Sequence, residues 1–287
     1  MTIAAALLVL LSAGLHVYWN LLVKQSSNPA KFTWVLQGFG ALAVLPIFLA
    51  VESPYQIDKI GWICISGTGA CYAGYYMFMA RSYECGDLSS SYPIVRGVAP
   101  VAAAIFGVIV FSERPSGMAW TGILAVCSGV GLIAWSDIYS LKVKMERAGV
   151  VSALITGFFS AGYLIVDKEG VRHVPVLLYL SLSYFAGFLA QWLVLLGMKA
   201  RGLTLKPILI RSEVLRANIA GIAASLGYVI ILFVMKSSPL SYVVPLRCSS
   251  IMLTIAYSGW VLKESISVSK CVSAVLILGG IIAISFG

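Results

Sequence analysis

Charged residues are scarce in this sequence. Asp, Glu, Lys and Arg make up 11% of its 287 residues, whereas hydrophobic residues make up 60%. With a mean hydropathy of +0.95, the chain has too little polar surface to cover a water-soluble globule. Its apolar residues occur in unbroken runs and not in the short alternating segments that membrane β-strands require. The composition therefore predicts an all-α integral membrane protein.

Histidine and cysteine are also sparse and unpatterned. The chain has two His and six Cys, and neither residue type shows the spacing of a metal site or a disulfide framework. No nucleotide-binding motif is present. The sequence thus predicts no cofactor and no bound metal, and it favours a protein without enzymatic activity over a membrane-embedded enzyme.

The net charge of +9 does not indicate nucleic-acid binding. The Lys and Arg residues gather in short connections between apolar runs, as the positive-inside bias of membrane proteins predicts. We therefore expect membrane lipid, and no nucleic acid, around this chain.

Ten apolar runs are long enough to cross a bilayer as helices. They form two groups of five, separated by a charged connection that contains Lys142, Lys144, Glu146 and Arg147. The first group lies at about 2–23, 33–51, 60–81, 89–111 and 117–135. The second lies at about 148–167, 175–197, 214–236, 240–262 and 268–286.

The two groups are diverged copies of one repeat. Arg96 is followed seventeen residues later by Glu113, and Arg247 is followed by Glu264 at the same spacing. Tyr, Leu and Pro precede the Arg at positions 76, 88 and 93 in the first copy and at 228, 240 and 245 in the second. Because five crossings reverse the side of entry, residues 1–136 and 148–287 are predicted to form two inverted five-helix repeats. Such repeats hold a substrate site between them near the midplane of the membrane.

The stretch YPIVRGVAP, followed by a helix that ends in SER and by a Gly-rich helix, resembles the EamA-type transporters of the drug/metabolite transporter superfamily. The resemblance covers nearly the whole chain and implies a secondary transporter that works by alternating access. The second half departs from the pattern, with VVPLRCSSI in place of YPIVRGVAP and KES in place of SER. The opening LHVYWNLLVK is similar to a branch of the family associated with phosphonate metabolism.

Arg96 and Arg247 are the first candidates for contact with a substrate. An Arg inside a spanning helix costs roughly 2.5 to 3.5 kcal/mol on insertion scales, so it faces a cavity or a partner. The structural alternative is a guanidinium bonded to carbonyls that Pro93 and Pro245 leave free one turn away. Both interpretations stay open for Arg96, and the structural one is slightly favoured for Arg247.

Two predicted helices carry polar faces that would be wasted against lipid. Helical spacing groups positions 12, 16, 19 and 20 on the first helix and positions 68, 72, 75, 76 and 79 on the third. Each tyrosine alone could simply bond within a packed core, but together they favour a polar cavity. The predicted substrate-binding residues are His16, Trp19, Asn20, Tyr72, Tyr75, Tyr76, Tyr92, Arg96, Tyr228 and Arg247.

We expect no carboxylate near the centre of a span, because the acidic residues, Asp167 among them, fall at predicted helix ends or in connections. With two intramembrane arginines, this favours a small anionic or zwitterionic substrate, such as an amino acid, an organic acid or a phosphonate. The alternative is a quaternary amine or other organic cation held by the tyrosines. His16 is either a neutral hydrogen-bonding group or the carrier of a coupling proton.

Glu113 and Glu264 are expected at corresponding helix ends, each beside a basic residue. A hydrated or paired surface charge is the favoured interpretation, ahead of a gating salt bridge. The expected setting is the inner or plasma membrane of a bacterial cell, where the chain would be a multi-pass monomer or homodimer.

Overall fold

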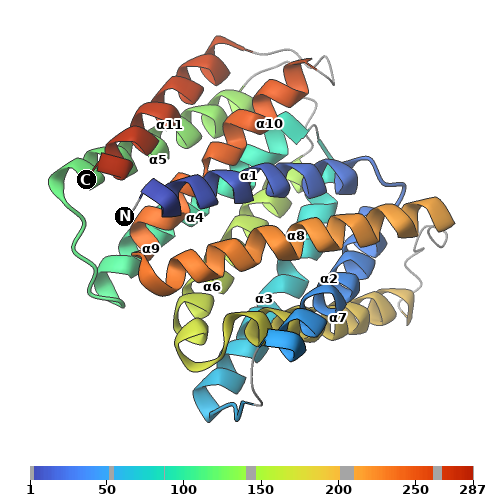
Figure 1. The fold of residues 1–287 in the computed structure, drawn as a ribbon. Helices are drawn as coiled ribbons and strands as arrows, with labels where there is room; N and C mark the ends of the chain where they lie inside the picture. The colour runs from blue at the N-terminus through green and yellow to red at the C-terminus, as the bar shows by residue number, and fades with distance from the viewer. Residues whose placement is uncertain are drawn as a thin grey trace.

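The computed structural model describes residues 3–51, 55–86, 88–139, 147–200, 210–260 and 267–286. Within these ranges the regular structure is entirely helical and comprises eleven α-helices (Figure 1). The first half contains α1 (Ile3–Lys24), α2 (Pro29–Val51), α3 (Lys59–Glu84), α4 (Leu88–Ile109) and α5 (Gly117–Tyr139). The second contains α6 (Arg147–His173), α7 (Val176–Ala200), α8 (Arg211–Ser237), α9 (Leu240–Arg247), α10 (Ser249–Trp260) and α11 (Val268–Phe286).

Each of the ten predicted spans contains a helix, and the ninth is divided into α9 and α10. Within the described ranges, seven segments are long and apolar enough to cross a membrane, with Leu240–Tyr257 counted as one of them. Helices α4 and α5 contribute shorter apolar stretches, Ile94–Ile109 and Gly117–Ile133. Helix α3 is less apolar because it carries many Tyr and Gly residues.

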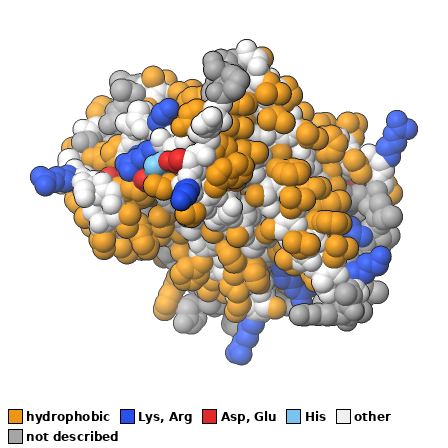
Figure 2. Space-filling model, turned by 90° about the horizontal axis from the view of Figure 1, so that it is seen from below, with side chains coloured by type: hydrophobic (Ala, Val, Ile, Leu, Met, Phe, Trp, Pro, Cys, Tyr) orange, Lys and Arg blue, Asp and Glu red, His pale blue; other side chains and the backbone are white. Residues whose placement is uncertain are grey.

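The outer surface of the bundle is apolar. Leu11, Ile63 and Leu193 are each more than half exposed, and comparable side chains occur on the other long helices. Figure 2 shows apolar side chains covering most of one face, with Lys and Arg side chains at its edges and in a group on its left part, beside acidic side chains and a His. In a membrane protein this surface contacts the lipid tails, so its exposure costs nothing.

The packing of the helices is symmetric under exchange of the two halves. Helix α1 packs on α8 and correspondingly α6 packs on α3, while α2 packs on α8 and α7 on α3. Helix α5 packs against α11, its own counterpart, and α2 packs against α7. The two chain ends lie on the same side of the bundle (Figure 1). This pairing is that of two five-helix repeats related by a pseudo-twofold axis.

Two corresponding glycines allow the halves to approach closely. A Cβ on Gly69 of α3 would lie 2.5 Å from the Cβ of Ala186 on α7. A Cβ on Gly221 of α8 would lie 2.6 Å from the carbonyl oxygen of Leu36 on α2. Only a residue without a side chain permits these contacts. They bring α3 and α8, which carry most of the predicted tyrosines, against the opposite half.

The ninth predicted span is interrupted at Cys248. Pro245 has no N–H to continue the helical bonding pattern, and the N–H of Cys248 donates to the Pro245 carbonyl at 3.0 Å in a tight turn. Arg247 is therefore the last residue of α9. Helix α4, the counterpart in the first half, passes through Arg96 without interruption.

Lysine side chains secure the ends of two helices, α3 and α8. Lys24 Nζ donates to the carbonyls of Tyr83 (2.6 Å) and Gly86 (2.5 Å) at the end of α3. In the second half, Lys168 Nζ donates to Met235 (2.6 Å) and Ser238 (2.8 Å) at the end of α8. A lysine thus occupies the negative end of the dipole in each of two corresponding helices.

Glu113 secures the start of α9. Its carboxylate accepts the N–H groups of Leu240 at 2.5 Å and Ser241 at 2.9 Å, where a negative charge is favoured by the helix dipole. The acid therefore joins the first half to the second through a helix terminus. Glu264, its predicted counterpart, lies outside the described residues.

Candidate substrate-binding site

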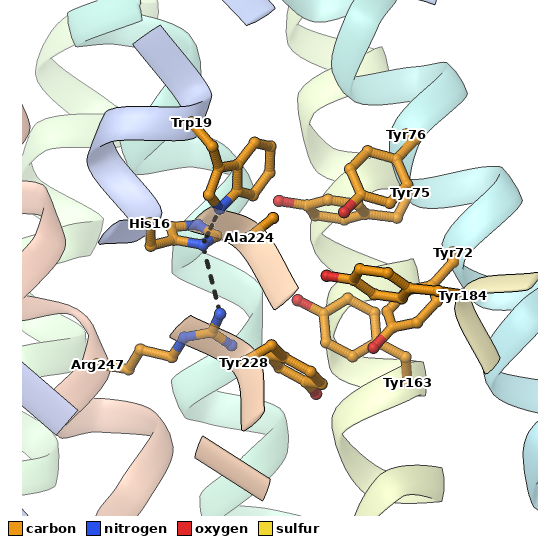
Figure 3. Close-up of a pocket in the computed structure, with 10 residues that line it drawn as sticks. All are labelled: His16, Trp19, Tyr72, Tyr75, Tyr76, Tyr163, Tyr184, Ala224, Tyr228 and Arg247. Atoms are coloured by element: carbon orange, nitrogen blue, oxygen red, sulfur yellow. Dashed lines mark hydrogen bonds between the residues drawn. The ribbon is translucent and has the colours of Figure 1, made fainter. Parts of the chain in front are cut away.

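A cavity lies between the two halves, with an empty volume of about 260 Å³. Helices α1 and α3 of the first half and α6, α7, α8 and α9 of the second all contribute side chains to it. Figure 3 shows His16, Trp19 and Arg247 facing a wall of tyrosine rings. The lining residues are His16, Trp19, Tyr72, Tyr75, Tyr76, Tyr163, Tyr184, Ala224, Tyr228 and Arg247.

Three of the predicted site residues lie outside this lining. Asn20 donates to the carbonyl of His16 and accepts from the Tyr83 hydroxyl, both at 2.7 Å, which gives it a structural contact within and between helices. Tyr92 bonds to Ser250 Oγ at 2.7 Å and so joins α4 to α10. Arg96 lies behind His16, with its guanidinium carbon 5.5 Å from the centre of the Tyr92 ring.

His16 is surrounded by groups that can only donate hydrogen bonds. Trp19 Nε1 donates to His16 Nδ1 at 3.1 Å, and Arg247 Nη2 approaches the same nitrogen at 3.3 Å. Arg96 Nη2 contacts the other ring nitrogen, Nε2. A neutral imidazole has one acceptor nitrogen and one N–H. Only one of the two ring nitrogens can therefore accept, so His16 cannot satisfy all of these donors.

The two guanidinium groups are buried without full hydrogen bonding. Arg96 is 3% exposed and Arg247 is 4% exposed, and among the described residues no carboxylate lies within 4.0 Å of either. Arg96 Nε and both Nε and Nη1 of Arg247 have no partner, and neither has the Tyr72 hydroxyl. This end of the cavity therefore has surplus donors and two positive charges, a state that is costly unless an acceptor binds.

The opposite wall of the cavity is built from packed tyrosine rings. The Tyr72 ring centre lies 5.0 Å from that of Tyr163 and 5.1 Å from that of Tyr184. Tyr75 and Tyr76 meet edge to face at 5.1 Å, and Tyr76 also contacts the indole of Trp19. The Tyr228 ring supports the guanidinium of Arg247, whose carbon lies 5.0 Å from the ring centre. Such rings offer apolar contact and negative π faces.

Asp167 is buried beside this wall, and the expectation that it lies at a helix end was wrong. Helix α6 continues to His173, and Asp167 is fully buried within it. Thr68 Oγ1 donates to Asp167 at 2.5 Å, the Tyr179 hydroxyl donates at 2.8 Å, and the Tyr228 hydroxyl donates to the second carboxylate oxygen. The charged sequence DKEGVRH ends the apolar run, but hydroxyls from three other helices compensate the acid there.

Tyr163, Tyr184 and Ala224 complete the lining but were not among the predicted residues. Tyr163 precedes Asp167 by one helical turn, so the two share a face of α6, a pattern that the sequence does display. Ala224 corresponds to Tyr72 when the repeats are aligned on Tyr76 and Tyr228. At this place in the lining, one repeat therefore has Ala where the other has Tyr. Only the packing of α7 brings Tyr184 to this place.

Both halves of the chain match the description "EamA-like transporter family", over residues 1–135 and 147–286. Over 155 residues the chain is 24% identical to "Uncharacterized transporter YwfM" of Bacillus subtilis (strain 168). This match covers 54% of this chain and 51% of the relative. Over 159 residues it is 30% identical to "Putative ribose uptake protein RbsU" of Latilactobacillus sakei subsp. sakei (strain 23K), covering 53% and 50%. The matches thus span about half the length of these curated relatives.

A solved structure described as "Crystal structure of protein" has the same fold. It superposes with a TM-score of 0.74 at 15% sequence identity, and the superposition covers 100% of this chain and 98% of the chain in that structure. At this identity the likeness concerns the fold alone.

Proposed function

This chain belongs to the EamA-like transporter family, and we propose that it is a secondary transporter that moves a small organic anion or zwitterion by alternating access. The observation that carries the proposal is the surplus of donors around His16. Arg96 and Arg247 are buried, have free N–H groups and have no carboxylate partner among the described residues. A carboxylate or phosphonate supplies several acceptor atoms and a compensating charge at once.

The tyrosine wall favours a zwitterion over a simple anion. With its acidic group at Arg247, a bound molecule places its remaining atoms against the rings of Tyr72 and Tyr163. A small ammonium group there gains a cation–π contact, and an apolar group gains burial. A quaternary amine without an anionic group uses the same rings but is repelled by Arg247, which lines the cavity.

Alternating access would follow from movement of one half against the other. We assign the moving units to residues 1–136 and 148–287, with the cavity at their junction. The proposal includes no chemical conversion, so the substrate should be recovered unchanged after transport. Because both named relatives come from bacteria, we place the protein in a bacterial cell membrane. All of the residues that line the cavity belong to one chain.

A binding screen tests the proposal. Purified protein is heated in detergent with L-alanine, succinate, aminoethylphosphonate, choline or ribose, and binding appears as a rise in melting temperature. Ribose is included because of the name of one relative. We expect one or more of L-alanine, succinate and aminoethylphosphonate to stabilise the wild type. This stabilisation should be lost in Arg247→Gln. It should be retained in Arg172→Gln, which removes an exposed arginine from α6. Stabilisation by choline or ribose alone would contradict the proposal.

A further inference from the structure

The carboxylate of Asp167 has no cationic partner within salt-bridge distance among the described residues. Three hydroxyls hold it, from Thr68, Tyr179 and Tyr228. Lys168, the next residue, points away to carbonyls at the end of α8. A buried carboxyl in such a setting is stable in either protonation state, because hydroxyls can donate to a carboxylate and can also accept from a carboxylic acid. An acid of this kind is suited to bind and release a proton.

Tyr228 connects this acid to the cavity. Its hydroxyl bonds to Asp167, while its ring lines the cavity and supports the guanidinium of Arg247. In Figure 3 the Tyr228 hydroxyl points away from the guanidinium. Of the three hydroxyls on Asp167, this one belongs to a residue that also lines the cavity. Tyr228 therefore places Asp167 one side chain away from the cavity.

We propose that Asp167 binds a coupling proton, and that this proton travels with the anionic substrate; the assignment of the cargo rests on the function proposed above. With Asp167 ionised, one negative charge opposes the two positive charges of Arg96 and Arg247. With Asp167 protonated, both positive charges are available to an anion. Proton binding and anion binding therefore favour each other, and by linkage the effect is reciprocal.

His16 is less suited to this role. A proton added to its ring would place a third positive charge between Arg96 and Arg247, and would remove the only acceptor nitrogen that the ring offers to the donors around it. The ring is better placed as a neutral spacer that holds the two guanidinium groups in position.

The Thr68 bond links protonation to movement of the halves. Thr68 lies on α3 of the first half, whereas Tyr179 and Tyr228 lie with Asp167 in the second half. Separation of the halves near this point removes one of three donors from the carboxylate. Since these donors favour the ionised form, their loss favours uptake of a proton. The acid would thus bind protons differently in the two states of the transport cycle.

The other titratable groups that face Asp167 do not account for uptake and release of a proton near neutral pH. They are a pair of thiols, four phenols and one guanidinium, namely Cys64, Cys71, Tyr72, Tyr179, Tyr184, Tyr228 and Arg247. Of these, Arg247 is the charged one, and it stays charged throughout. A group that titrates near neutral pH at this place would therefore be Asp167.

Infrared spectroscopy tests the proton site without any substrate. In wild-type protein, the C=O stretching band of a protonated buried carboxyl should grow as pH is lowered, and Asp167→Asn should lack it. Tyr179→Phe, which removes a donor outside the cavity lining, should move the midpoint of the titration to higher pH. Glu169→Gln, which removes a partly exposed acid two residues away, should leave the band intact. A band that persists in Asp167→Asn, or that never appears in the wild type, would overturn the proposal.

Binding measured against pH tests the coupling. L-Alanine is a suitable probe because its own charge state is constant around neutral pH. Its affinity for the wild type should rise by up to about tenfold for each unit of falling pH when one proton is linked. Asp167→Asn should bind at the high-affinity level at every pH. A wild-type pH dependence retained in that variant would refute the coupling. If neither L-alanine nor the other anionic probes bind at all, the proposed function fails, while the infrared band still decides the proton site.

Discussion

The His16 end of the central cavity and the Asp167 end, which lies beside the tyrosine wall and outside the lining, have opposite hydrogen-bonding balances. At the first end, His16 of α1 meets the side chains of Trp19, Arg96 and Arg247, all of which donate, and several N–H groups have no acceptor. At the second end, Asp167 of α6 accepts from three hydroxyls. Helices α1 and α6 occupy corresponding places in the two repeats, so the two copies have come to differ in the polar groups that they hold.

This difference predicts that one end contributes mainly to stability and the other mainly to ligand binding. The Asp167 end satisfies its own polar atoms, so it contributes to stability and needs no ligand. The His16 end does not, and a ligand with acceptor atoms would lower its free energy. Removal of a side chain should therefore weaken folding at one end and binding at the other.

The largest effect is expected from Asp167→Ala. This change leaves the hydroxyls of Thr68, Tyr179 and Tyr228 without their acceptor, at a cost of about 3 kcal/mol or more in unfolding free energy. Thermal unfolding in detergent should show a melting temperature well below that of the wild type. Glu169→Ala, at a partly exposed position of the same helix, serves as the control and should change it little. Equal stability of the two variants would remove the distinction between the ends.

Arg247→Gln should produce the complementary result. Loss of a charge-assisted bond worth roughly 1.5 to 3 kcal/mol weakens affinity for an anionic probe by about tenfold to more than a hundredfold. Its melting temperature without ligand should hold or rise, because an uncompensated buried charge is gone. Arg247→Lys should retain part of the affinity.

Arg96→Gln should reduce affinity less than Arg247→Gln, because Arg96 contacts His16 from outside the cavity lining. Arg96→Lys keeps the charge and should lose less still. Titration of the same probe against the four arginine variants gives the comparison. Full affinity in folded Arg247→Gln and Arg96→Gln would contradict the anion site.

Gly170→Ala should disturb the Asp167 end alone. A Cβ at Gly170 of α6 would overlap the ring of Tyr179, whose hydroxyl bonds to Asp167. Overpacking of this kind costs about 1 to 3 kcal/mol. Gly67→Ala is the matched control, since its Cβ would lie 3.7 Å from Val166, an ordinary contact. Unfolding measured by denaturant or heat should place Gly170→Ala below Gly67→Ala. Equal stability of the two variants would mean that the Tyr179 ring can move aside without a loss of folding free energy.

The smallest effect concerns Asp58, an exposed acid that also joins α3 to α6. The Gly61 N–H, at 2.7 Å, and the His173 ring, at 2.8 Å, hold the pKa of Asp58 below its usual value. A lowered pKa in the folded state gives stability that is present above the usual Asp pKa and is lost as pH falls through the lowered value. Asp58→Asn should therefore lower the melting temperature slightly at neutral pH and not at strongly acidic pH. A constant difference at all pH values would show that the charge of Asp58 is not involved.

Composition and periodicity alone predicted the class of this protein and its plan. Continuous apolar runs of about 20 residues specify membrane helices, and the repeated spacing from Arg96 to Glu113 and from Arg247 to Glu264 predicted the two copies. The polar faces of the first and third helices identified His16, Trp19 and the α3 tyrosines, which the structure places around one cavity. These features are local, so they can be recognised along the chain.

Tertiary packing decided the features that depend on distant neighbours. Asp167 stands at the end of an apolar run, and its burial follows from hydroxyls on α3, α7 and α8. Tyr184 reaches the cavity, and Arg96 is set behind His16, because of how helices of the two halves pack. Hydropathy sums residues that are adjacent in sequence, whereas burial and hydrogen bonding depend on groups that only the fold brings together.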